Sequence, residues 1–211
     1  MTRTIWHCHI AVSLDGKIAC PDGSFDWLEG YPPQEFGLDA FLAEVDDIVM
    51  GRATYETLRG FGEWPHPGKP TFVVTSRPLD LLADGFPPGV EARPADFGAL
   101  AAELEGRGCR RVWIEGGGRV IRGMMEGGRL DVLEMAVLPL VLGDGITLFP
   151  PGTPGLGLRL VKCEPPDGRG AACRLRSRAV ESFRLDQNRF PPHSNGEVPR
   201  RGGGIMTPSP S

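Results

Sequence analysis

The sequence predicts an α/β protein with a mixed, mainly parallel central sheet that ends in antiparallel strands. Over the first 128 residues, short apolar segments of strand character alternate with segments whose apolar residues recur at helical spacing. Strands separated by helices pair in parallel, because a parallel pair needs a long crossover connection. After residue 130 the apolar segments follow one another without a helical segment between them, which favours antiparallel pairing there.

The first half of the chain is expected to form three strands and two helices. Residues 4–12, "TIWHCHIAV", predict a strand that stops at the Asp-Gly turn signals of "SLDGKIACPDGS". Residues 36–45, "FGLDAFLAEV", have the apolar spacing of a helix. A buried strand over 46–51, "DDIVMG", leads directly into a helix over 52–60, "RATYETLRG", and a further buried strand follows at 71–76, "TFVVTS".

The second half continues the alternation and then loses it. A helix is expected over 95–108, a strand over 110–115 and a helix over 118–128. "DVLEMAVLPLVLG", from residue 131, predicts a longer strand, and "LGLRLVKCE" and "AACRLRSRAV" predict late antiparallel strands. We therefore expect one domain over residues 1–180. Residues 181–211 are polar and rich in Pro, Gly and Ser, and are expected to form a disordered tail.

The composition excludes several classes of protein. The chain has 211 residues, 40% hydrophobic and 24% charged, as in an ordinary soluble domain with a full core. A net charge of −4 argues against a general binder of nucleic acid or of acidic membranes. No apolar stretch approaches the roughly 18 residues that span a bilayer, and the N-terminus lacks the apolar region of a signal peptide. We expect a cytoplasmic protein that binds neither nucleic acid nor membrane.

The five cysteines are scattered along the chain: Cys8, Cys20, Cys109, Cys163 and Cys173. Their number is odd and no pair forms C-x-x-C, so the pattern indicates neither a zinc ribbon nor a disulfide framework. We expect free thiols in a reducing compartment.

Three consecutive glycines separate an expected strand from an expected helix in "RRVWIEGGGRVIRGMME". One interpretation is a simple tight turn. The other is a turn that lets a ligand approach the backbone closely, because bare N–H groups at the start of a helix bind phosphate well. Common nucleotide motifs fit poorly. "GGGRVI" lacks the third glycine of a dinucleotide fingerprint, and "GEWPHPGKP" has Pro70 where a Walker loop has Ser or Thr, which argues against a P-loop kinase.

Three strand-to-helix junctions taken together are more informative. "VMGRATYETL", "VVTSRPL" and "IEGGGRVIRGMM" each place small, hydroxyl or basic groups at the carboxyl end of a buried strand. Ligands of open α/β sheets bind at that edge. Three such junctions on one edge fit a ligand with three phosphates, such as NADPH.

These motifs, with "SLDGKIA" and the segment that runs on to "VLPLVLGDGITLF", resemble the dihydrofolate reductase-like superfamily over about residues 5–180. The sequence is most similar to the branch that contains the reductase domain of riboflavin biosynthesis. The resemblance implies a three-layer α-β-α fold, NADPH as the cofactor and a homodimer. The long apolar strand expected from residue 131, near the end of the sheet, also favours a homodimer. It also implies a cis peptide between the first two of the three glycines.

The resemblance further implies which residues bind the cofactor. Gly51, Arg52 and Thr54 match the family's helix start beneath the cofactor phosphates. The loop for the adenosine 2′-phosphate corresponds to Thr75, Ser76 and Arg77, where charge-assisted donors would favour NADPH over NADH. The pyrophosphate turn corresponds to Gly116, Gly117, Gly118, Arg119 and Val120. We expect Ile18 and Ala19 to contact the nicotinamide ring. The alternative is that they are ordinary core residues.

The substrate end is expected near "SLDGKIA" and at the residue before the glycines. Asp15 is a candidate to hold a substrate hydroxyl or N–H, or it belongs to a simple Asp-Gly turn. Lys17 is a candidate to pair with a phosphate or to donate a proton, or it is a solvated lysine. Glu115 precedes the glycines as in riboflavin-type reductases and faces the substrate, or it is a polar residue at a strand end.

Two further features of the sequence argue against a metal site and against true dihydrofolate reductase activity. His7 and His9 share one face of a strand, but no further ligand lies at a recognisable spacing, so no metal is expected. The carboxylate that dihydrofolate reductases place on their first helix has no clear match in Asp39 or Glu44. The sequence therefore predicts an NADPH-dependent reductase of a C=N or C=O bond in a pterin-like, pyrimidine-like or sugar-imine substrate. The alternative is a dinucleotide-binding module without turnover.

Overall fold

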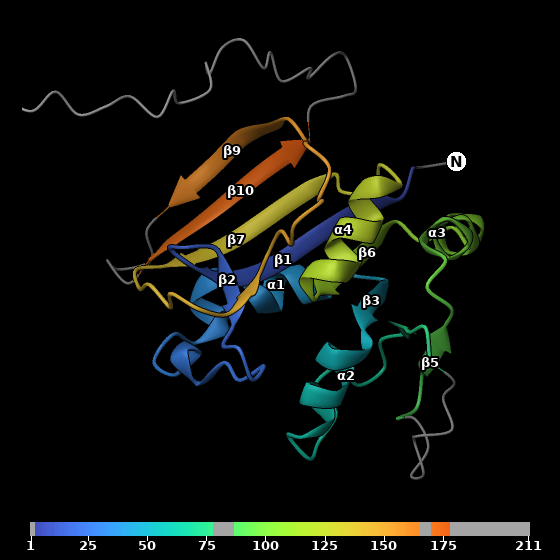
Figure 1. Cartoon of the computed structure of the whole chain (residues 1–211). Helices are drawn as coiled ribbons and strands as arrows, with labels where there is room; N and C mark the ends of the chain where they lie inside the picture. Colours follow the sequence, from blue (N-terminus) through green and yellow to red (C-terminus); the bar gives the residue numbers. More distant parts are fainter. Residues whose placement is uncertain (1–2, 78–86, 165–169, 178–211) are drawn as a thin grey trace, which may run out of the picture.

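An eight-stranded mixed sheet forms the centre of the computed structural model, which describes residues 3–77, 87–164 and 170–177 (Figure 1). The predicted tail over 181–211 lies outside the described residues. Neighbouring strands are parallel except where β10 meets β7 and β9, so the predicted mixed sheet with an antiparallel end is confirmed. The strand order is β5 (Val90–Arg93), β4 (Thr71–Val74), β3 (Asp47–Gly51), β6 (Arg111–Gly116), β1 (Ile5–Ser13), β7 (Val132–Leu138), β10 (Ala171–Ser177) and β9 (Leu158–Glu164).

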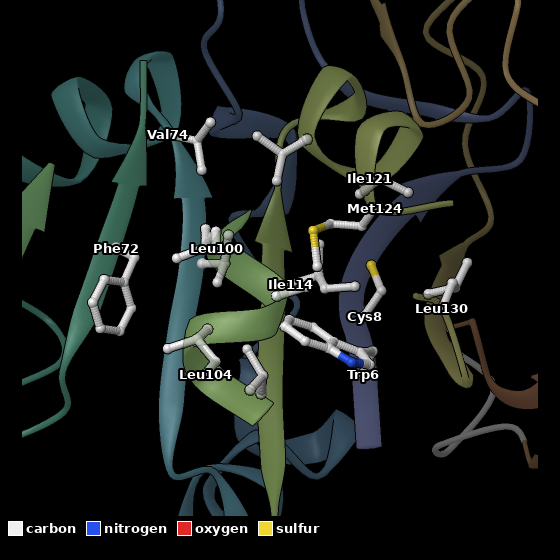
Figure 2. Packing of buried hydrophobic residues seen from close by; sticks show 14 of the residues in the cluster. Trp6, Cys8, Phe72, Val74, Leu100, Leu104, Ile114, Ile121, Met124 and Leu130 are labelled. Carbon is white, nitrogen blue, oxygen red and sulfur yellow. The ribbon is translucent and has the colours of Figure 1, made fainter. Parts of the chain in front are cut away.

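Helices cover both faces of the sheet and complete the three layers. On one face, α1 (Leu38–Glu44) and α2 (Arg52–Arg59) pack through Phe41 and Tyr55 against β3 and β6. The other face is covered by α3 (Phe97–Gly106) and α4 (Gly118–Glu126). Figure 2 shows side chains of these two helices packed with those of β1, β4 and β6. Two 3₁₀ turns, η1 (Asp26–Leu28) and η2 (Pro33–Phe36), precede α1.

Some elements differ from the sequence prediction. The expected strand from residue 131 ends as β7 at Leu138, because Pro139 has no N–H with which to continue a ladder. Three short strands were not predicted. One is β5, at the edge of the sheet, where Val90 alone is fully buried and the apolar pattern is too weak to read. The others are β2 (Lys17–Ala19) and β8 (Ile146–Thr147), which form a small antiparallel sheet of their own.

The expectation of five free thiols was wrong for two of the cysteines. Cys163 on β9 and Cys173 on β10 lie directly opposite each other in the antiparallel ladder and form a disulfide. The other three, Cys8, Cys20 and Cys109, are free. The sequence spacing of ten residues gave no sign of this pair, because it depends on the register of the hairpin.

Candidate cofactor and substrate cleft

A cleft of about 1180 Å³ lies at the carboxyl edge of the parallel strands. Its walls come from the ends of β3, β4 and β6, from the starts of α2 and α4, and from the segment that contains η1 and η2. The small β2–β8 sheet closes one side. The cleft therefore lies where open α/β sheets bind their ligands, and all three predicted junctions meet in it.

The glycine turn leads into α4 at this edge. The peptide between Gly116 and Gly117 is cis, as the resemblance implied, and Gly116 has a φ of 127°, which side-chain-bearing residues rarely adopt. Gly117 is the N-cap of α4 and Gly51 is the N-cap of α2. No described side chain caps the start of α2 or of α4, so the first N–H groups of these two helices are free to bind an anion.

The third junction follows β4. The hydroxyl of Thr75 accepts a hydrogen bond from the backbone N–H of Arg77 at 3.2 Å, which forms a compact turn. Ser76 and Arg77 are exposed on this turn and line the cleft. Arg52, at the start of α2, also lines the cleft, and its Nε donates to Glu56 one turn along the helix at 2.6 Å. Arg119 also lines the cleft, so three arginines in all give the cofactor end a positive character.

Most of the predicted site residues lie in this one cleft. Those that line it are Ile18, Ala19, Gly51, Arg52, Thr54, Thr75, Ser76, Arg77, Glu115, Gly117, Gly118, Arg119 and Val120. Three predicted residues are not among the described lining residues: Asp15, Lys17 and Gly116.

Asp15 has a structural environment. Its carboxylate accepts hydrogen bonds from the Ser13 hydroxyl at 2.6 Å and from the backbone N–H groups of Leu142 and Gly143 at 3.1 and 2.8 Å. The bond from Ser13, with those from the loop, lowers the pKa of Asp15 to about 2. These contacts join the turn after β1 to the loop after β7, and both oxygens are occupied, which favours the turn interpretation over a role at the substrate.

Lys17 also lies away from the cleft lining. It belongs to β2 and pairs with Thr147 of β8, and its Cγ lies close to Gly145. Its neighbours Ile18 and Ala19 line the cleft, whereas Lys17 is not among the described lining residues. The structure thus favours the solvated lysine over the phosphate partner.

Glu115 does reach the cleft, and it has a partner that the sequence did not reveal. His66, in the loop after α2, lies with its Nε2 2.8 Å from Glu115 Oε1. The side chains are 7% and 10% exposed, respectively. His66 lies between prolines in "WPHPG", far from Glu115 in the chain, so no local pattern signals the contact. The lining near Glu115 includes Trp113 on β6 and His9 on β1.

The rest of the substrate end is mostly apolar. Side chains from β1, β7 and the segment that contains η1 and η2 form this wall: Ala11, Leu28, Tyr31, Phe36, Ala136 and Leu138. A cavity with apolar walls and few polar groups is the usual form of a small-molecule site. The titratable side chains that line this part of the described cleft are Glu115, His9 and Tyr31.

Next to His9 lies a partly buried polar network. Glu134 on β7 accepts hydrogen bonds from His7 at 3.1 Å and from Arg174 at 3.1 and 3.0 Å, and Arg111 donates to His7 Nδ1 at 2.8 Å. Burial lowers the pKa of His7, which keeps the ring neutral. Burial alone would raise the pKa of Glu134, but the bonds from His7 and Arg174 outweigh it, and the pKa is lowered.

This network also bears on a metal site. One potential ligand atom from each of His7, His9 and Glu134 lies within 4.8 Å of the others. Arginine only donates, so the bond from Arg111 to Nδ1 leaves the ring hydrogen of neutral His7 on Nε2, the nitrogen that faces Glu134. A metal would need that nitrogen without its hydrogen, so the contacts at His7 do not suit a ligand.

The fold and the position of the cleft define a dihydrofolate reductase-like α/β protein. A dihydrofolate reductase from Enterococcus faecalis, solved in complex with NADP(H), has this fold; it aligns with a TM-score of 0.57 and 20% identity and covers 84% of this chain and 99% of its own. The chain belongs to the RibD C-terminal domain family, whose model matches residues 6–169.

Two nearer relatives support this placement. The uncharacterized protein YwjB of Bacillus subtilis is 34% identical over 154 residues, which cover 72% of this chain and 86% of YwjB. A putative riboflavin biosynthesis protein from Shewanella sp. PV-4 aligns with a TM-score of 0.74 and 28% identity, covering 82% of this chain and 98% of its own. In the part of the chain that the structure describes, no helix is long and apolar enough to cross a bilayer.

Proposed function

We propose that this protein is an NADPH-dependent reductase of a small unsaturated molecule. The observation that carries the proposal is the convergence of three strand-to-helix junctions in one cleft. Two of them are helix starts without a side-chain cap, and the third presents Ser76 and Arg77. This donor set fits a dinucleotide with an additional phosphate, because free N–H groups and arginines are the preferred partners of phosphate oxygens.

In this assignment the start of α4, with Gly117 and Arg119, binds the pyrophosphate. Gly51 and Arg52 bind from the start of α2, and the turn of Thr75, Ser76 and Arg77 binds the adenosine 2′-phosphate. Bound NADPH would supply a hydride from its nicotinamide ring. The chain's own residues orient the ring against Ile18 and Ala19, exclude water with apolar walls, and bind the substrate at the end that contains Glu115.

The substrate class proposed from the sequence is a pterin-like, pyrimidine-like or sugar-imine molecule. The apolar walls beside Phe36 and Leu138 favour a flat ring, and Glu115 supplies a polar group at its edge. Asp15 and Lys17 have no place in this assignment, because neither is among the described lining residues.

The rival proposal is a dinucleotide-binding module without turnover. A thermal-shift titration separates binding from no binding: a ligand at 100 times its dissociation constant adds about 2.7 kcal/mol to the stability of the native state. A clear shift with NADPH followed by loss of NADPH absorbance with a member of a pterin and pyrimidine panel supports the reductase. A shift with no oxidation of any panel member supports the binding module, and no shift contradicts both.

A homodimer is proposed separately. The long apolar strand that favoured a homodimer is β7, but β7 lies inside the sheet between β1 and β10. The edge strand at this end of the sheet is β9, where Leu160 and Val161 are 58% and 44% exposed and offer apolar area to a second copy. Light scattering at micromolar concentration tests this, and a monomer mass contradicts it.

A further inference from the structure

His9 has no role in the proposed assignment, although it lines the substrate end of the cleft. Its side chain is nine-tenths buried, and its Nδ1 makes no hydrogen bond within the described chain. Nδ1 lies 3.9 Å from Glu134 Oε2, which is within reach of an ion pair but too long for a hydrogen bond. Because Nδ1 is turned toward β7, Nε2 is the ring nitrogen that a molecule in the cleft can reach.

The orientation of the His9 ring is set by its neighbours. The ring of Phe41, on α1, stacks on it with centroids 4.7 Å apart and an interplanar angle of 17°. The indole Nε1 of Trp113, on β6, donates a hydrogen bond to the backbone oxygen of His9 at 3.1 Å. The protein therefore fixes both the backbone and the ring plane of this histidine without help from a ligand.

His9 lies between two carboxylates on one face of the sheet. Glu134 is its register partner on β7. On the other side, β1 pairs with β6 through His7 and Trp113, and Glu115 lies two residues further along β6 on the same face. A buried imidazolium needs a counter-charge, because a charge that is removed from water must be paired. These two carboxylates supply it.

The other charged groups of this network are paired among themselves. Arg174 on β10 donates to Glu134 at 3.1 and 3.0 Å. Arg111 on β6 donates to His7 and forms an ion pair with Glu44 of α1 at 2.8 Å. Burial lowers the pKa of His7, so that ring stays neutral. The four charges of the two arginines and the two glutamates cancel, and the carboxylate on β6 adds a negative charge on the side of the cleft.

We propose that His9 is a catalytic residue: in its protonated form it donates the hydrogen on Nε2 to the acceptor atom of the substrate's reducible C=N or C=O bond. This inference rests on the proposed reductase function and supplies the proton that such a reduction needs. The substrate carbon takes the hydride from NADPH, and the π electron pair of the double bond forms the new N–H or O–H bond. The Nε2–H bond breaks, its electron pair stays on the neutral imidazole, and water restores the proton. Glu134 is a positioning residue, because it acts only through His9.

The protonation of His9 can be followed directly, because the chain has 4 histidines. Nitrogen NMR spectra of the imidazole rings are recorded on the full chain from about pH 8 to 5, and His9→Gln identifies the His9 signals. We expect the ring to take up a proton in this range while the protein is folded. In Glu134→Gln, which removes a counter-charge, protonation should need a lower pH, whereas the matched variant Glu164→Gln, on the exposed edge strand β9, should behave as the wild type. A ring that stays neutral throughout, or an equal effect of both variants, overturns the inference.

Two probes of one shape test the donor. Isoquinoline N-oxide presents an acceptor oxygen, and 2-methylnaphthalene has a methyl group in its place. NMR titration gives both affinities at a pH where His9 is protonated and at one where it is neutral. We expect the N-oxide to bind about tenfold more tightly at the first pH, as a charged donor allows, and less than about threefold more tightly at the second. In His9→Gln, whose amide does not titrate, the ratio should be the same at both pH values. A ratio that still depends on pH in this variant, or no preference for the N-oxide in the wild type, overturns the inference.

Failure of this inference is distinct from failure of the proposed function, because neither measurement needs turnover. A thermal melt of each variant shows that it is folded. NADPH binding without a pH-dependent probe preference overturns the assignment of His9 and leaves the reductase proposal standing. A pH-dependent preference without NADPH binding supports the donor and contradicts the cofactor. With any panel member that is reduced, His9→Gln should lower kcat by about a hundredfold or more, as loss of a general acid does.

Discussion

Gly118→Ala tests how tightly the start of α4 packs against the segment that closes the cleft. A Cβ at residue 118 would lie 2.5 Å from the backbone oxygen of Thr147 and 3.0 Å from that of Leu148. Both contacts are to backbone, so relief requires the strand β8 or the helix to move. Overpacking of this kind costs about 1–3 kcal/mol. In a chain of this size each kcal/mol lowers the melting temperature by about 2–4 °C, so we expect a loss of about 2–12 °C.

The assay is a thermal melt followed by circular dichroism, with Gly106→Ala as the matched control. Gly106 is the last residue of α3, and a Cβ there would meet no atom within 4 Å. Alanine is the better helix former by up to about 1 kcal/mol, so the control should be neutral or slightly stabilising. Equal melting temperatures for the two variants would refute the reasoning, because they would show that residues 147–148 do not lie against the helix start.

Two further predictions concern thiols and pH. Burial raises the pKa of Cys8 to about 12, and burial with the contact to Asp47 raises that of Cys109 to about 12, so we expect one alkylated cysteine, Cys20, in the native protein. Three should react after unfolding without reductant, by mass spectrometry; five would contradict the Cys163–Cys173 bond. For pH, the lowered pKa of His7 means that the unfolded chain takes up its proton first, so stability should fall as pH drops below about 6.5. The lowered pKa of Glu134 adds a further loss below about 4.5. Melting temperatures from pH 8 to 4 check this, and His7→Gln should flatten the fall between pH 7 and 5; an unchanged slope in that variant contradicts the assignment.

The arrangement of the cofactor end was predictable because it follows from local patterns. Buried strands that stop at small or basic residues, each followed by a helix, must place those residues at one sheet edge. These patterns predict that the junctions at Gly51, Thr75 and Gly117 meet, and the structure places them in one cleft.

What the sequence did not reveal depends on distant contacts. The partner of Glu115 is His66, 49 positions away in a proline-rich loop, and its place is set by packing against Trp64 and Trp113. The disulfide depends on hairpin register, which a one-residue slip would change. Asp15 was a candidate site residue because a carboxylate in a loop can either bind a ligand or stabilise the loop. Its hydrogen bonds from Leu142 and Gly143 identify the structural role.

The measurement that tests the cofactor assignment most directly is calorimetric titration of the wild type, Arg77→Ala and Arg159→Ala with NADPH and with NADH. A charge-assisted hydrogen bond to a phosphate contributes about 1.5–3 kcal/mol, which is about tenfold or more in affinity. We predict that the wild type prefers NADPH by that factor and that Arg77→Ala loses the preference without changing NADH affinity. Arg159 is exposed on β9, and its variant should behave as the wild type. Equal affinity of the wild type for both nucleotides, or no binding of either, would contradict the account.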